Sequence, residues 1–185
     1  FWLLLREGID AGMGAIQRDK RILTKINTPL MVVILSRYGS VCANTLIRLV
    51  FLIFILYYYK IVPSLNIILI PFMVFPLVAL GLGLGILLGI FNSANNDIAN
   101  VSKIFFRYGM FLSSVIFPMP SEGAIGLLNN FNIFNHLIVG IRDFLVLGHL
   151  QYPAHFGVSS AIGLGIIILS IKWQHTVQYR VKGLL

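Results

Sequence analysis

The side chains of clearest chemical interest are two arginines that interrupt apolar stretches of the sequence. Arg48 lies near the middle of the stretch 38–59, and Arg107 lies near the start of the stretch 104–118. A charge in apolar surroundings must reach water, pair with an acid or bind an anion. All three possibilities stay open for Arg48. Arg107 is expected to snorkel toward water because it lies near the end of its stretch.

Residues for catalysis or metal binding do not form any recognisable pattern. The single cysteine, Cys42, excludes an internal disulfide and a cysteine-based metal cluster. The sequence lacks the motifs of serine hydrolases, of H-E-x-x-H zinc enzymes and of phosphate-binding loops. We therefore expect this chain to be no enzyme and to hold no cofactor. The four histidines, none at metal-ligand spacing, are His136, His149, His155 and His175.

A glycine-rich run has the spacing of a helix-packing motif. Gly81, Gly85 and Gly89 are four residues apart, so they share one face of a helix. Small residues at this spacing let two helix backbones approach closely. We predict helix packing here, and the same spacing recurs at Gly157, Ala161 and Gly165.

Aromatic residues gather in and around the stretch 104–118. They suit a lipid-facing or packing surface, and they also suit a sugar pathway, because aromatic faces match the apolar faces of pyranose rings. Both interpretations stay open for Phe105, Phe106, Tyr108 and Phe111.

The composition indicates a protein that resides in a membrane. Of 185 residues, 58% are hydrophobic and 11% are charged, with a mean hydropathy of +0.90. A soluble domain carries about 25% charged residues. The net charge of +8 could suggest nucleic-acid binding, but the basic residues lie mostly at the ends of apolar stretches, which is typical of membrane proteins. We therefore predict contact with membrane lipid and no nucleic-acid partner.

The apolar stretches predict an all-α, polytopic transmembrane bundle. A membrane-spanning helix needs about 20 mostly apolar residues. Residues 1–14 hold only a stub or a surface helix. Because the chain opens on Phe1, we expect that a first span is missing and that residues 1–185 form one N-terminally truncated domain. Four full spans are predicted at 38–59, 67–90, 104–118 and 154–173.

The distribution of lysine and arginine predicts the sidedness. Residues 15–37, 91–107 and 172–185 hold ten of the fourteen basic residues and are expected on the cytoplasmic side. This assignment requires that residues 123–148 do not cross the membrane. The many asparagines in this segment support that requirement, because burying an amide side chain against lipid without a hydrogen-bond partner costs free energy. We therefore predict a re-entrant hairpin over residues 123–148 that dips in from outside.

Four stretches carry a resemblance to a known family. They are the basic segment from Gly14 to Pro29, the glycine-rich run from Ala79 to Asp97, the stretch from Phe111 to Pro118 and the stretch from Asn130 to Arg142. Their order resembles the membrane subunit of polysaccharide-exporting ABC transporters, the ABC-2 permease family, which exports O-antigen, capsule and teichoic acid. The resemblance covers nearly the whole chain.

The resemblance implies a multi-pass permease subunit in the inner (cytoplasmic) membrane that exports lipid-linked glycan. Two copies would form the pore as a homodimer. Two cytoplasmic ATP-binding cassette subunits would bind ATP with Mg²⁺ and hydrolyse it. The implied ATPase-coupling residues are Arg18, Asp19, Lys20, Arg21, Lys25, Pro29 and Asp97. Pathway candidates are Arg48 and the four aromatic residues above, and outer-gate candidates are Asn130, Asn132, Asn135 and Arg142.

Other functions stay open at this point. Within the same family, the exported molecule could be another lipid or a hydrophobic drug. A membrane-embedded transferase acting on lipid-linked sugar and a non-catalytic assembly subunit are alternatives from other classes. A neighbouring ATPase gene with a Walker A motif would favour the exporter over both.

Overall fold

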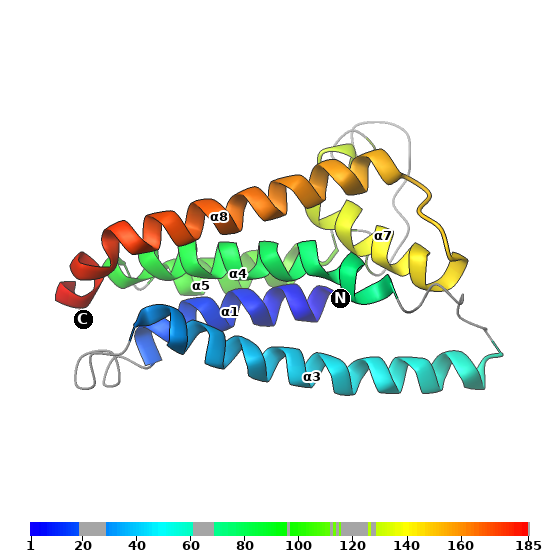
Figure 1. Cartoon of the computed structure of the whole chain (residues 1–185), viewed down its shortest axis with the longest axis horizontal. Coiled ribbons are helices and arrows are strands. Elements are labelled where there is room, and N and C mark those ends of the chain that lie inside the picture. The colour runs from blue at the N-terminus through cyan, green and yellow to red at the C-terminus, as the bar shows by residue number, and fades with distance from the viewer. Residues whose placement is uncertain are drawn as a thin grey trace.

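Helices are the regular secondary structure of the described chain (Figure 1). The computed structural model describes residues 1–18, 29–60, 69–95, 97–111 and 129–184, together with positions 113, 115 and 126. The predicted all-helical fold is confirmed for these residues. The helices are α1 (Trp2–Arg18), α3 (Leu30–Tyr58), α4 (Ile70–Ala94), α5 (Asp97–Tyr108), α7 (Ile133–Leu147) and α8 (Pro153–Leu184).

Three helices are long and apolar enough to cross a membrane. Their candidate spanning segments are Met31–Tyr58 in α3, Ile70–Ser93 in α4 and Pro153–Thr176 in α8. Each exceeds the roughly 20 residues that the hydrocarbon core requires. These segments overlap three of the four predicted spans.

Prolines set where α3 and α4 begin. Pro29 caps α3 in an extended conformation (φ −59°, ψ 132°), so the helix starts at Leu30 rather than at residue 38 as predicted. Pro71 lies in the first turn of α4, where the missing N–H removes no helical hydrogen bond. It therefore belongs to the helix start, and only Pro76 lies inside the helix.

The shorter helices α5 and α7 differ from the spanning helices. They contain 12 and 15 residues, which corresponds to about 18 and 22 Å at 1.5 Å per residue. The hydrocarbon core is about 30 Å thick. The span predicted over 104–118 is not one continuous helix, because α5 starts at Asp97 and a turn follows at Gly109–Phe111. Most residues after 111 in that prediction lie outside the described part of the chain.

The hydrophobic core is centred on α4, which lies between α1 and α8 (Figure 1). Leu5 and Ile9 of α1 are fully buried beside Leu77 and Leu80 of α4, and Ile141 of α7 belongs to the same cluster. α1 was predicted as a stub or a surface helix, but its apolar face is part of this core. The second half of α3 diverges from α4 and exposes most of its apolar side chains.

Glycines on opposite faces of α4 bring its backbone close to both neighbours. A Cβ added at Gly81 would lie 3.4 Å from the carbonyl oxygen of Leu5, and one added at Gly85 would lie 3.1 Å from the Cα of Gly12. On the other face, the Ser170 hydroxyl of α8 donates a hydrogen bond of 2.9 Å to the carbonyl of Gly83. Two faces of α4 thus contact neighbouring backbones, as small residues allow. Gly89 is also buried, near the end of α4.

The second predicted small-residue stripe does not pack in the described part of the chain. A Cβ added at Gly157 or Gly165 would meet no atom within 4 Å, and Ala161 is exposed. Gly163 instead faces α4, where an added Cβ would lie 3.0 Å from the carbonyl oxygen of Pro76. The prediction of packing at Gly157 and Gly165 is therefore wrong for this chain by itself.

A substitution at Gly12 tests the packing of α1 on α4. A Cβ added there would lie 2.6 Å from the backbone of Gly85, so Gly12→Ala must separate the two helices. We expect a loss of about 1–3 kcal/mol in the free energy of unfolding. Gly39→Ala on α3 is the matched control, because nothing lies within 4 Å of its added Cβ, and it should change stability by less than about 1 kcal/mol. Thermal unfolding in detergent measures both, and equal melting temperatures for the two variants would contradict the packing.

Candidate functional site

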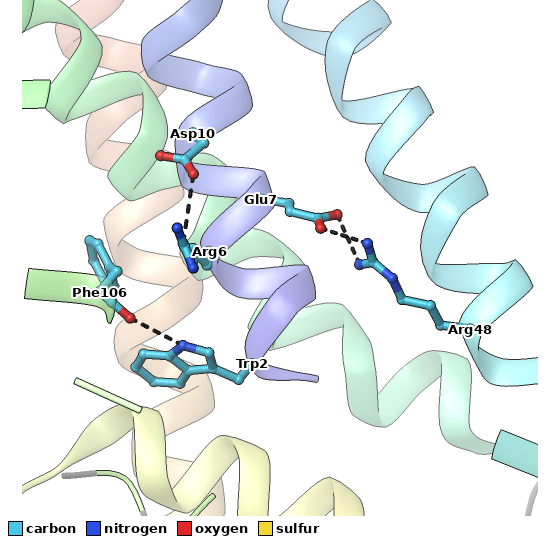
Figure 2. A network of polar contacts seen from close by, with 6 residues as sticks. All are labelled: Trp2, Arg6, Glu7, Asp10, Arg48 and Phe106. Carbon is cyan, nitrogen blue, oxygen red and sulfur yellow. Dashed lines mark hydrogen bonds and ion pairs between the residues drawn. The ribbon is translucent and has the colours of Figure 1, made fainter. Parts of the chain in front are cut away.

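A bidentate ion pair connects α1 to α3 (Figure 2). Arg48 Nη2 donates to Glu7 Oε1 at 2.6 Å, and Arg48 Nη1 donates to Glu7 Oε2 at 2.9 Å. Two parallel charge-assisted bonds are the strongest geometry that these groups can form. Of the three possibilities that the sequence left open for Arg48, the structure shows pairing with an acid on another helix.

The pair lies far from either end of the candidate spanning segment of α3. Arg48 precedes Tyr58 by ten residues, or about 15 Å of helix, and follows Met31 by a larger interval. With α3 across a membrane, this depth is close to the middle of a core about 30 Å thick. A charge at this depth needs a partner, and Glu7 provides it.

The polar side of α1 carries further contacts next to this pair (Figure 2). Arg6 Nε lies 3.9 Å from Asp10 Oδ2, one helical turn away. The Trp2 indole donates a hydrogen bond of 3.2 Å to the carbonyl of Phe106 on α5. The polar groups of α1 thus reach α3 through Glu7 and α5 through Trp2, while Leu5 and Ile9 pack with residues of α4.

Two cavities flank the ion pair. The first, of about 270 Å³, lies between α1 and the beginning of α3, and its polar lining includes Glu7, Asp10 and Arg37. The second, of about 480 Å³, is mostly apolar and lies between α1, the second half of α3 and α7. Arg48 and Arg142 are its two charged lining residues.

The predicted ATPase-coupling residues are described only in part. Arg18 is the last residue of α1, Pro29 precedes α3, and Asp97 is exposed in the first turn of α5. The Asp97 N–H donates a hydrogen bond of 3.1 Å to Asn95 Oδ1, which helps to start α5. The remaining four, Asp19, Lys20, Arg21 and Lys25, lie outside the described residues.

The aromatic pathway candidates separate into two groups. Phe106 is 5% exposed and packs in the core, with its ring centroid 6.4 Å from Trp2 and 5.9 Å from Phe134. The other three candidates, Phe105, Tyr108 and Phe111, have exposed side chains. The four residues therefore do not line one surface together.

The asparagines predicted as an outer gate organise the start of α7. Asn132 caps this helix, because its side-chain oxygen accepts a hydrogen bond of 3.2 Å from the Asn135 N–H. The Asn130 carbonyl lies 2.9 Å from His136 Nε2. Asn135 is buried, and its side-chain oxygen has no hydrogen-bond partner among the described residues. These asparagines therefore lie together at one end of α7.

Arg142 lies farther along α7, away from these asparagines. Its Nε and Nη2 approach a single oxygen of Asp143 at 3.3 and 3.2 Å. The Asp143 side chain is 9% exposed, whereas that of Arg142 is 52% exposed. The structure thus places Arg142, predicted as an outer-gate residue, in the same cavity as Arg48, predicted as a pathway residue.

The main residue that sequence reasoning missed is Glu7. It lies in the segment 1–14, which was predicted as a stub or a surface helix, and it was not named as the partner of Arg48. The available signal was its position in the apolar-flanked segment 1–14, which contains just two acids, Glu7 and Asp10.

No model of a known protein family matches the chain, and no curated protein matches it.

Proposed function

We propose that this chain is the membrane-spanning permease subunit of an ATP-driven exporter of lipid-linked polysaccharide. The proposal is supported first by the order of the four stretches between Gly14 and Arg142, which resembles polysaccharide-exporting ABC-2 permeases. It is also supported by an all-helical fold with three helices suited to a membrane.

The observation that carries the proposal is the meeting of several helix ends at one end of the bundle (Figure 1). The end of α1, the start of α3, the end of α4 and the end of α8 lie there together. Ala15 packs in one cluster with Ile34 and Ile90, and the Phe91 ring centroid lies 5.0 Å from that of Trp173. These helix ends belong to segments predicted as cytoplasmic from their basic residues, whereas α5 runs back from this end until Phe106 contacts Trp2 at the start of α1. The shared end is a suitable place for a cytoplasmic ATPase.

In the proposed mechanism, this end receives the motion of two ATPase subunits, and two copies of the chain enclose the path of the glycan. The basic segment that precedes Pro29 and the start of α5 at Asp97 transmit the motion. Residues 123–148 form a re-entrant hairpin that gates the outer mouth. The hairpin fits the short α7, whose 15 residues extend about 22 Å.

Purification from native membranes tests this proposal. We expect the tagged chain to retain an ATP-binding cassette subunit with a Walker A motif, and the complex to hydrolyse ATP while the chain alone hydrolyses none. Reversing the charges at Arg18, Lys20 and Arg21 together should release the ATPase, since a partner held by these basic residues would then be repelled. Stable purification without any ATPase, together with sugar transfer by the isolated chain, would refute the exporter and favour a transferase.

A further inference from the structure

The cavity of about 480 Å³ between α1, α3 and α7 combines an apolar wall with two guanidinium groups, those of Arg48 and Arg142. Its volume is within the range of small-molecule sites, about 300–1,000 Å³. We propose that this cavity, which we call the Arg48–Arg142 groove, binds the diphosphate of the lipid-linked glycan while the lipid crosses the membrane. The inference rests on the function proposed above and specifies where its substrate is held.

One face of α3 forms the apolar wall of the groove. Arg48, Leu49, Leu52 and Leu56 line it together with Thr45. Their spacing of three and four residues places them on a single helix face. From Thr45 to Leu56 this face extends about 16 Å, so it can accommodate several isoprene units of a lipid chain beside the charged groups.

The two acids that hold the arginines are not among the lining residues of the groove. Glu7 accepts two of the five N–H donors of Arg48, and Asp143 accepts two of the five of Arg142. Three donors on each guanidinium therefore remain for an anion. Without a ligand, the carboxylates of Glu7 and Asp143 balance the charges of the two arginines. A diphosphate has enough oxygens to accept hydrogen bonds from both guanidinium groups.

The depth of Arg48 in the membrane indicates whether the groove suits a lipid in transit or a resident phospholipid. The phosphate of an ordinary phospholipid lies at the membrane surface, outside a core about 30 Å thick. Arg48 lies about 15 Å of helix from Tyr58, where three consecutive tyrosines and Lys60 form a typical interfacial anchor. A phosphate at Arg48 is therefore far below the headgroup level, which is the position of a lipid in transit.

Direct binding to the full-length protein in neutral phosphatidylcholine nanodiscs tests the groove. The probe is radiolabelled geranylgeranyl diphosphate, with geranylgeraniol as the uncharged control. We expect saturable binding of the diphosphate alone, and an excess of phosphatidylglycerol should not displace it. Arg142→Gln should weaken binding about tenfold or more, the effect of losing a strong charge-assisted contact. Arg107→Gln, which changes an exposed arginine on α5 outside the groove, should leave it unchanged.

A second variant separates binding from folding. Glu7→Gln combined with Arg48→Gln removes both charges of the pair, and it should also weaken binding about tenfold while the protein elutes as the wild type in gel filtration. Wild-type affinity in either groove variant, or displacement by phosphatidylglycerol, would overturn the inference. The assay needs no ATPase, so it can fail while ATP-driven export is intact, and it can succeed when no ATPase partner is found.

Discussion

Replacing Arg48 alone by Gln is expected to lower the free energy of unfolding by roughly 2–3 kcal/mol, because it leaves the Glu7 carboxylate without its partner near the middle of the membrane. The pair is bidentate, with distances of 2.6 and 2.9 Å, and it joins α1 to α3. α3 has few other contacts in its second half, where many apolar side chains are exposed. For a chain of this size, the loss corresponds to a fall in melting temperature of roughly 5–10 °C.

A double-mutant cycle isolates the pair from the general effect of substitution. Glu7→Gln with Arg48→Gln replaces two charges by two neutral amides of similar shape, so it should recover most of the lost stability. Arg107→Gln is the matched control, since no ion pair of Arg107 exists within the described residues and its side chain is exposed. Unfolding followed by tryptophan fluorescence in detergent measures all four proteins. A double variant no more stable than the single one would show that the contact does not hold the helices together.

The long helices could be predicted from composition because a spanning segment depends on a local property, a run of apolar residues. This property located α3, α4 and α8 within a few residues of their starts or ends. It failed at the beginning of α3, because the span was predicted to start at residue 38 although the helix starts at Leu30. Pro29 sets the actual helix start.

The role of α1 could not be predicted because it depends on contacts between distant segments. Because Arg6, Glu7 and Asp10 follow only a short apolar piece, residues 1–14 were predicted as a stub or a surface helix. In the structure Glu7 reaches across to Arg48 of α3 and Arg6 pairs with Asp10 along α1, while Leu5 and Ile9 are fully buried in the core. The glycine spacing on α4 predicted a close helix neighbour, but the identity of that neighbour, at Gly12, appeared only in the structure.

The sidedness of the chain and the proposed outer gate both depend on the membrane topology. Cysteine labelling measures it most directly. In a Cys42→Ala background, single cysteines replace Ser121, His149 and Gln178, with Ser159 as a buried control. In intact cells an impermeant thiol reagent should label positions 121 and 149 fully and should not reach positions 159 and 178. Labelling at 121 and 178 without labelling at 149 would contradict the account, because residues 123–148 would then be a true span and the basic end of α8 would lie outside.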